Sequence, residues 1–160
     1  MGGWAFERRV GDLMQGHPDK FKETLRWNAE VGEQLTGPEI GRAEQKRAAL
    51  YHRIRRFMET YDFLVLPVTQ VVPFDVKQQY VDTINGEKLE TYIDWMKACY
   101  FISVTGLPAI SVPCGFTDEG LPVGVQIVGR HQDDFGVLQL AYAFQEATAV
   151  WRRRPPDMSA

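Results

Sequence analysis

Apolar side chains recur at intervals of three and four residues in four stretches of the chain, which is the spacing of one face of an α-helix. These stretches, predicted to be helical, are 18–35, 36–60, 90–104 and 133–149. The second is the longest, and only Arg47 interrupts its apolar face. We therefore expect a long helix that packs one side against other elements.

Two of these helices begin with recognisable start signals. Thr36 and Glu39 have the spacing of a capping box, and Pro38 lies in the first turn, where its missing N–H costs nothing. Asp133 and Asp134 begin the last helix, where the helix dipole favours negative charge. Leu138, Ala141 and Gln145 follow on one side of this helix.

Three shorter apolar segments are typical of β-strands. Phe63–Pro67 is an apolar run that ends in proline, which predicts a strand buried on both faces. Residues 109–113 and 123–129 are separated by the turn-rich stretch 115–122, and they predict an antiparallel pair. The sheet is therefore expected to lie between helices.

Between the first strand and the third helix, residues 67–90 carry little periodic pattern. They contain Pro67, Pro73 and the turn pair Asn85-Gly86, which predicts an extended surface loop with a small hairpin. Loops of this length often carry function.

No repeat or low-complexity stretch divides the chain, so we treat residues 1–160 as one segment. In order, its parts are an extended lead-in over 1–17, helices over 18–60, a strand and long loop over 61–90, a helix, strand pair and helix over 91–150, and a tail over 151–160.

Composition narrows the class of partner. A net charge of −3 gives no overall positive field, so nucleic acid is not expected to bind. The longest uncharged apolar stretch, 99–116, is broken by glycine and proline, so neither a membrane-spanning helix nor a membrane partner is expected.

Two cysteines without a C-x-x-C pair suit a reducing cytoplasm. Basic residues surround most of the second helix rather than form a patch: Arg42, Lys46, Arg47, Arg53, Arg55 and Arg56.

Side chains that could perform catalysis are few. The hydroxyl candidates are Ser103, Ser111 and Ser159. None lies in a motif that supplies a base, and strand alternation places Ser111 opposite its apolar neighbours, which favours a structural role. Cys114 has no histidine near it in sequence. His131 with Asp133 and Asp134 could supply a metal site, although helix capping by the two aspartates is the simpler interpretation.

The chain from Gly106 onward reads Gly-Leu-Pro-Ala-Ile-Ser-Val-Pro-Cys-Gly-Phe and, after a turn, Leu-Pro-Val-Gly-Val-Gln-Ile-Val-Gly-Arg. This run resembles the C-terminal hallmark of the amidase signature family. Three further segments are similar to family segments in the same order: 35–43, 61–67 and 138–147. Agreement of several motifs over residues 20–155 is a stronger signal than any single short pattern.

The resemblance implies an α/β fold, the C-terminal portion of the amidase signature fold, in which a mixed β-sheet is flanked by helices. It also implies hydrolysis of a small-molecule amide to carboxylate and ammonia through a Ser–cis-Ser–Lys triad, without metal or organic cofactor. In that family the triad belongs to a Gly/Ser-rich region, and no such run occurs here. We therefore assign no catalytic residue, cofactor site or metal ligand to this chain, and we expect it to be inactive alone.

The resemblance also places the helix before Gly106 beside the acyl-binding cleft. Its candidates for substrate binding are Trp95, Tyr92, Met96 and Cys99, and packing in the core is the alternative for most of them. The subunits that release ammonia from glutamine for transfer-RNA amidation carry an acidic residue about where Met96 falls. The match therefore leans toward a general amidase.

Two alternatives stay open. The chain could be part of the glutamine-amidase subunit of a transfer-RNA amidotransferase, or it could be a stand-alone noncatalytic binding or assembly module. A segment of a larger fold exposes the apolar surface that the rest of the fold would cover, and such surfaces associate. We therefore expect homo-oligomers.

Overall fold

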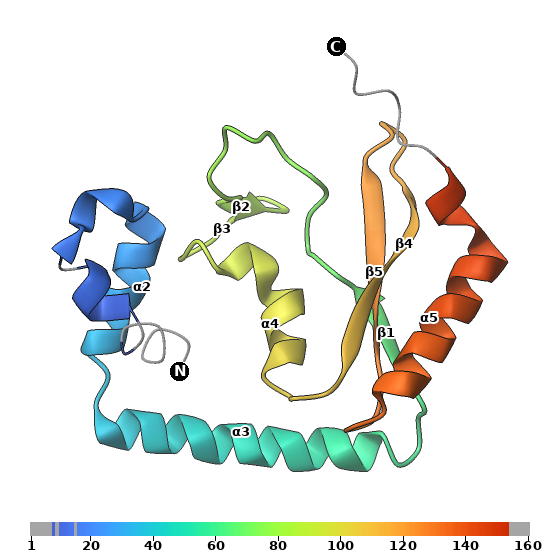
Figure 1. The fold of residues 1–160 in the computed structure, drawn as a ribbon, viewed down its shortest axis with the longest axis horizontal. Coiled ribbons are helices and arrows are strands. Elements are labelled where there is room, and N and C mark those ends of the chain that lie inside the picture. Colours follow the sequence, from blue (N-terminus) through green and yellow to red (C-terminus); the bar gives the residue numbers. More distant parts are fainter. Residues whose placement is uncertain (1–7, 9, 15, 154–160) are drawn as a thin grey trace. The chain divides into compact units, whose positions relative to one another are not determined.

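The computed structural model describes residues 8, 10–14 and 16–153, and Figure 1 shows the path of the chain. Its contacts divide the chain into two compact units, Met1–Ala49 and Leu50–Ala160. The boundary falls within helix α3, Gly37–Phe57. The treatment of the chain as one segment stays a prediction.

The lead-in to the first unit is helical where the structure describes it. Residues 10–14 form a helix, whereas the sequence predicted an extended lead-in over 1–17. That prediction is wrong for 10–14, because Val10 and Met14 lie one helical turn apart and Met14 is buried. Residues 1–7 lie outside the described part.

The helix predicted over 18–35 is interrupted. Pro18–Lys20 form a single 3-10 turn, and helix α2 covers Glu23–Glu33. Phe21 and Lys22 between them have extended backbone, with ψ of 136° and 149°. Because an apolar pattern can continue across such a break, the sequence does not reveal it.

Helix α3 begins behind Thr36, as the sequence predicted. The Glu39 carboxylate accepts hydrogen bonds from the Thr36 backbone N–H at 2.9 Å and from the Thr36 hydroxyl at 2.7 Å. The backbone bond, aided by the hydroxyl, holds the pKa of Glu39 below its usual range. None of the 21 residues of α3 is buried, so its predicted apolar face is only partly covered.

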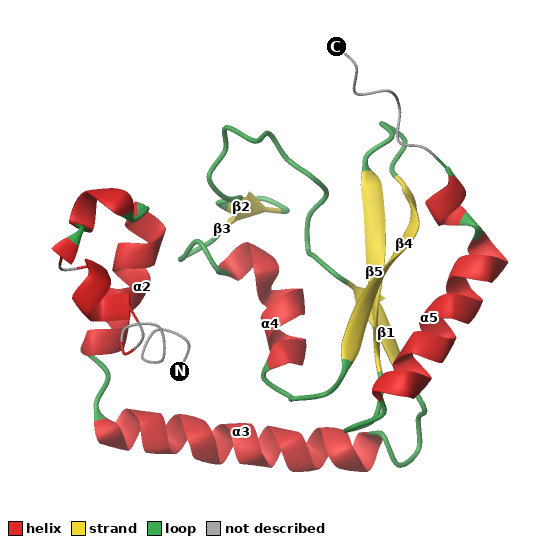
Figure 2. Cartoon of the chain, in the orientation of Figure 1, coloured by secondary structure: helices red, strands yellow, loops and turns green. Residues whose placement is uncertain are grey.

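The second unit is built around a three-stranded antiparallel sheet, which Figure 2 shows edge-on beside α5. The strands are β1 (Leu64–Pro67), β4 (Ala109–Phe116) and β5 (Pro122–Val128), in the order β1-β5-β4. Val128 of the central strand lies between Leu64 and Ala109. The α/β class and the predicted strand pair are confirmed. All strand pairs among the described residues are antiparallel.

Helix α5, Asp134–Thr148, packs on β4 and β5 and closes the core. Val112, Ile127 and Ala141 are the buried centre of this core, each less than 5% exposed. Figure 1 shows α5 running along one face of the two strands. The sheet face turned away from α5 is therefore the one available for a site.

The start of α5 was predicted correctly. The Asp133 side chain accepts a hydrogen bond from the Gly136 N–H at 3.0 Å and caps the helix. The buried residues of α5 are Val137 and Ala141, whereas Leu138 is 55% exposed.

Strand β1 is exposed on one face, where the sequence predicted burial on both. Val65 is 52% exposed although it is paired with Ile127, which is buried under α5. Helix α5 packs on β4 and β5, so no element among the described residues covers β1 on that side. The strand order also makes β1 an edge strand, because it pairs with β5 alone in this sheet.

A small hairpin and a short helix join β1 to β4. The hairpin pairs β2 (Thr83–Ile84) with β3 (Glu87–Lys88) around Asn85-Gly86, whose φ values of 51° and 80° are left-handed, as the sequence predicted. The helix predicted over 90–104 is shorter than expected. A 3-10 turn, Asp94–Met96, leads into α4, Lys97–Ser103.

The described end of the chain is a 3-10 turn, Val150–Arg152, in which Val150 is buried. The predicted tail over 151–160 falls mostly outside the described residues, which end at 153.

Candidate functional site

A groove of about 510 Å³ opens on the side of the sheet away from α5. It is lined by the loop 68–74, which follows β1, and by Trp95, which precedes α4. The remaining lining comes from Ser111 of β4 and from residues 122–124 at the start of β5. Most of these side chains are apolar, which suits a small organic ligand.

Two aromatic rings meet in this groove. The Phe74 and Trp95 ring centroids are 5.4 Å apart and the ring planes are at 87°, an edge-to-face pair. Phe74 is 36% exposed, so the pair presents an apolar surface to a ligand. Such a surface favours flat apolar groups.

The turn that carries Trp95 is fixed by a carboxylate. Asp94 accepts hydrogen bonds from the Thr91 N–H at 2.8 Å and the Thr91 hydroxyl at 2.9 Å, and it lies 3.1 Å from the Lys97 ammonium. The Thr91 N–H is the main reason that the pKa of Asp94 lies below its usual range. The hydrogen bond from Lys97 to Asp94 raises the pKa of Lys97. Trp95 therefore stands on a defined turn rather than a loose loop.

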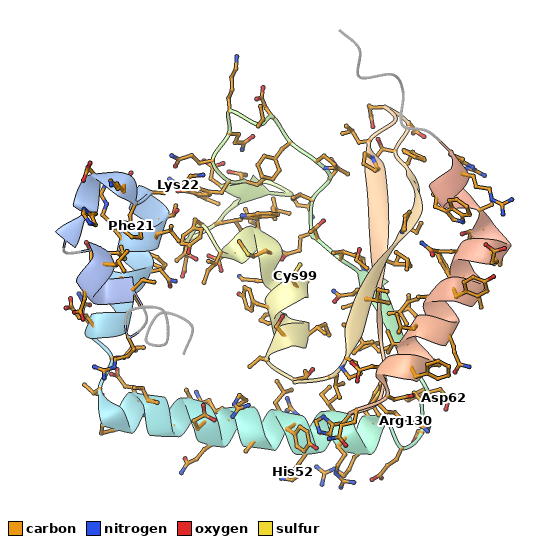
Figure 3. The ribbon with its side chains drawn as sticks, in the orientation of Figure 1. Phe21, Lys22, His52, Asp62, Cys99 and Arg130 are labelled. Carbon is orange, nitrogen blue, oxygen red and sulfur yellow. The ribbon has the colours of Figure 1, made fainter. Side chains whose placement is uncertain are left out.

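Hydrogen bonds join the loop after β1 to α4 along one seam, which we define as residues 67–70 against Ala98 and Cys99. The Gln126 amide donates to the carbonyls of Pro67 and Ala98, each at 3.0 Å. The Cys99 thiol donates to the Val68 carbonyl at 2.9 Å. Figure 3 places Cys99 on α4, beside the sheet.

The four residues predicted to bind substrate have different surroundings. Trp95 lines the groove, and the other three are not among its lining residues. Tyr92 pairs edge-on with Tyr80, with ring centroids 6.3 Å apart, and Cys99 belongs to the seam. Met96 ends the 3-10 turn and is half-buried. Substrate binding by these residues stays a prediction.

Apart from Trp95, the residues that line the groove were not predicted to bind substrate, among them Phe74, Ser111 and Gly124. The signal for Ser111 was in the sequence, because strand alternation turns it away from the core. Gly124 also lies against the groove, since a Cβ there would come within 3.3 Å of the Ser111 hydroxyl and 3.4 Å of Val68. Phe74 lies in the long loop, where no periodic pattern reveals direction.

The described serines are not arranged for nucleophilic catalysis. Ser103 donates its hydroxyl hydrogen to the Cys99 carbonyl at 3.2 Å. Within the described part of the chain, no serine hydroxyl is hydrogen-bonded to a lysine or a histidine. Ser159 lies outside the described residues. The groove therefore offers binding surface rather than a reactive centre.

A second hollow, of about 370 Å³, lies at the end of α3, between Tyr51, Met58 and His131. Arg130 borders it and donates to the Met58 carbonyl at 3.0 Å and to Asp62 at 2.8 Å, the pair labelled in Figure 3. The His131 ring meets Tyr51 edge-on, with centroids 5.8 Å apart. Arg130 thus joins the end of α3 to the end of β5.

The metal site that His131, Asp133 and Asp134 could have supplied, the less favoured alternative, receives no support. Among the described residues, no three His, Cys, Asp or Glu side chains lie close enough to hold a metal ion. Asp133 caps α5 instead. In the same part of the chain, no helix is both long and apolar enough to cross a membrane.

Comparison with known proteins places this geometry in a family. A family model described as Amidase matches residues 11–138. An acylamidase from Rhodococcus erythropolis is 38% identical over 125 residues, which are 78% of this chain and 26% of the acylamidase. A glutamyl-tRNA(Gln) amidotransferase subunit from Thermodesulfovibrio yellowstonii is 35% identical over 118 residues, which are 72% of this chain and 22% of that protein. The chain thus spans about a quarter of the length of these relatives.

Solved structures share the fold. A bacterial aryl acylamidase of the amidase signature enzymes superposes with a TM-score of 0.79 at 22% identity, over 94% of this chain and 32% of its own. A 6-aminohexanoate cyclic dimer hydrolase superposes with a TM-score of 0.74 at 22% identity, over 96% of this chain and 34% of its own. At these identities the likeness establishes the fold.

Proposed function

From the premise that this chain belongs to the Amidase family, we propose that it forms the scaffold and part of the substrate groove of an enzyme that hydrolyses a carboxamide to carboxylate and ammonia. We further propose that it is the C-terminal portion of that enzyme, and that the catalytic triad lies in polypeptide beyond it. The proposal rests on one observation, the apolar groove beside Trp95 on the open face of the sheet.

The residues that line the groove support the proposal that the catalytic triad lies outside this chain. Amide hydrolysis needs a nucleophile, a base that takes its proton and donors for the oxyanion. The described residues of the groove include one serine hydroxyl, that of Ser111, and no histidine, lysine or carboxylate. The chain by itself is therefore expected to bind an amide without hydrolysing it.

The edge-to-face pair of Phe74 and Trp95 favours an amide that carries an aromatic or other flat apolar group. The glutamine-amidase subunit of a transfer-RNA amidotransferase is the second candidate, since one amidotransferase subunit is 35% identical to this chain. A glutamine site needs charged groups for the amino and carboxylate ends of its ligand. Met96, where the resemblance expects an acidic residue in such subunits, is apolar, so we favour the general amidase. A noncatalytic module remains the third possibility.

Acetanilide, a small aryl amide, tests the proposal directly. We expect it to shift the indole N–H resonance of Trp95, and we expect Trp95→Ala to weaken its affinity about tenfold, the effect of losing one buried aromatic contact. Trp151→Ala is the matched control, because Trp151 lies in the terminal 3-10 turn and is 52% exposed. Glutamine is titrated in parallel.

Equal acetanilide affinity in the Trp95→Ala and Trp151→Ala variants would sink the groove assignment. Tight binding of glutamine without binding of acetanilide would instead favour the glutamine-amidase alternative. Amide turnover by the isolated chain would show that it holds a nucleophile of its own. The absence of binding to any of these amides would favour the noncatalytic module.

We also propose that the chain acts in the reducing cytoplasm, because its two cysteines, Cys99 and Cys114, are both free.

We further propose that the chain self-associates. The outer side of α5 exposes Phe135, Leu138 and Tyr142, which are 71%, 55% and 68% exposed and lie at helical spacing. An apolar stripe of this kind supports association between copies.

A further inference from the structure

Gln126 is a polar side chain buried in the middle of the sheet. It is 6% exposed and lies on the central strand, opposite Leu66 of β1 on one side and Ser111 of β4 on the other. A buried amide is costly unless its hydrogen-bonding groups find partners. The burial of Gln126 therefore requires hydrogen-bond partners for its amide group.

The Gln126 amide nitrogen serves two separate segments. It donates one hydrogen bond to the Pro67 carbonyl and one to the Ala98 carbonyl, both at 3.0 Å. Pro67 immediately precedes the groove loop 68–74, and Ala98 follows Trp95 by three residues. One amide group thus holds together the two sides of the groove.

Two weaker bonds cross the same seam. The Cys99 thiol donates to the Val68 carbonyl at 2.9 Å, and the Ala98 N–H donates to the Gln70 side-chain oxygen at 3.3 Å. A thiol is a weak donor, and Gln70 is exposed, so neither bond can replace a buried amide. Gln126 is the central contact of the seam.

We propose that Gln126 is a positioning residue that sets the separation between Trp95 and the loop 68–74, and so the width of the groove. Without its two donors, the carbonyls of Pro67 and Ala98 lose a partner in a partly buried setting. The two segments then separate and admit water. This inference rests on the proposed function for its consequence in substrate binding, but the seam itself can be tested independently.

Gln126→Met tests the inference, because methionine keeps the length of the side chain and removes both donors. Ile127→Val is the matched control, since Ile127 is the next residue and packs on the opposite face of the sheet. The first readout is the rate at which a thiol reagent labels Cys99, measured in a Cys114→Ser background. The labelling rates of the two variants are compared under conditions that give both variants the same free energy of unfolding. Global unfolding then contributes equally to the two rates.

We expect Cys99 in Gln126→Met to be labelled about tenfold faster than in the control, the effect of roughly one lost hydrogen bond. Acetanilide affinity is expected to fall by a similar factor in Gln126→Met and to stay unchanged in Ile127→Val. Equal labelling rates in the two variants would overturn the proposal. If Gln126→Met does not fold, Gln126→Leu carries the labelling test, with the same rise expected because leucine also lacks both donors.

The two readouts separate the two hypotheses. A wild-type protein that binds no acetanilide would remove the proposed function, while the labelling rates would still decide the role of Gln126. Faster labelling with unchanged acetanilide affinity would overturn the claim that Gln126 sets the groove for its ligand.

Discussion

At the scale of single residues, Gly129 is a buried glycine with close neighbours. A Cβ at this position would overlap the Val137 side chain and lie 3.4 Å from the Asp133 carbonyl. The end of β5 and the start of α5 therefore lie so close together that only glycine, whose side chain is a hydrogen atom, fits without a shift. Any larger residue must displace the Val137 side chain or the elements themselves.

We predict that Gly129→Ala lowers the free energy of unfolding by about 1–3 kcal/mol, the usual cost of overpacking a core. Urea unfolding followed by circular dichroism measures this change. Gly41→Ala is the control, because Gly41 lies within α3 with nothing within 4 Å of an added Cβ. That variant is expected to gain about 0.5–1 kcal/mol. Equal stability of Gly129→Ala and wild type would contradict the close approach.

Sequence reasoning found some of these residues and not others for physical reasons. Trp95 could be selected because the family resemblance places the segment before Gly106 beside the acyl-binding cleft. The inward position of Val137 rather than Leu138 could not be read from the sequence, since α5 is apolar on adjacent stripes and a rotation of one residue preserves the pattern. Gln126 was not selected, because a glutamine within an apolar strand does not reveal which carbonyls it meets.

At the scale of elements, α4 depends on the turn that precedes it. Asp94 accepts two hydrogen bonds from Thr91 and pairs with Lys97, and the pKa of Asp94 is lowered. A carboxyl group with a lowered pKa in the folded state stabilises the fold above its unfolded pKa of about 3.9. That stabilisation disappears as the pH falls through the folded pKa.

We therefore predict that the melting temperature of the wild type falls more between pH 5 and pH 3 than that of Asp94→Asn. The asparagine oxygen can still accept from Thr91 but carries no charge that acid can remove. Glu39 and Glu119, whose pKa values are also lowered, contribute the same background to both proteins. Identical acid dependence in the two proteins would show that Asp94 does not stabilise the turn.

Elements with their own local signals were predicted well. The cap of α5, the hairpin turn at Asn85-Gly86 and the β4–β5 pair each follow from short-range chemistry. The burial of β1 was predicted wrongly, because the sequence of an apolar strand does not reveal whether a helix or second sheet covers each of its faces. The break at Phe21 and Lys22 was missed, since nothing in the local pattern requires it.

At the scale of the whole molecule, the exposed stripe on α5 predicts association. Sedimentation equilibrium is expected to give a mass above that of one chain at high concentration. Leu138→Glu should shift the equilibrium toward the monomer, because it places a charge in the centre of the stripe. Gln139→Glu is the control for added charge, since Gln139 is also exposed on α5. A clean monomer for the wild type would rule out this interface.

The arrangement of the sheet also bears on how the protein is made. The central strand, β5, is the last of the three to be synthesised. β1 therefore cannot pair until the chain has been extended to Val128, the partner of Leu64. At ~5–20 residues per second, a ribosome needs several seconds to cover that distance. For most of this interval β1 has no partner strand, because β4 is synthesised only shortly before β5. We therefore expect the apolar β1 segment of the nascent chain to need protection from association until β5 emerges.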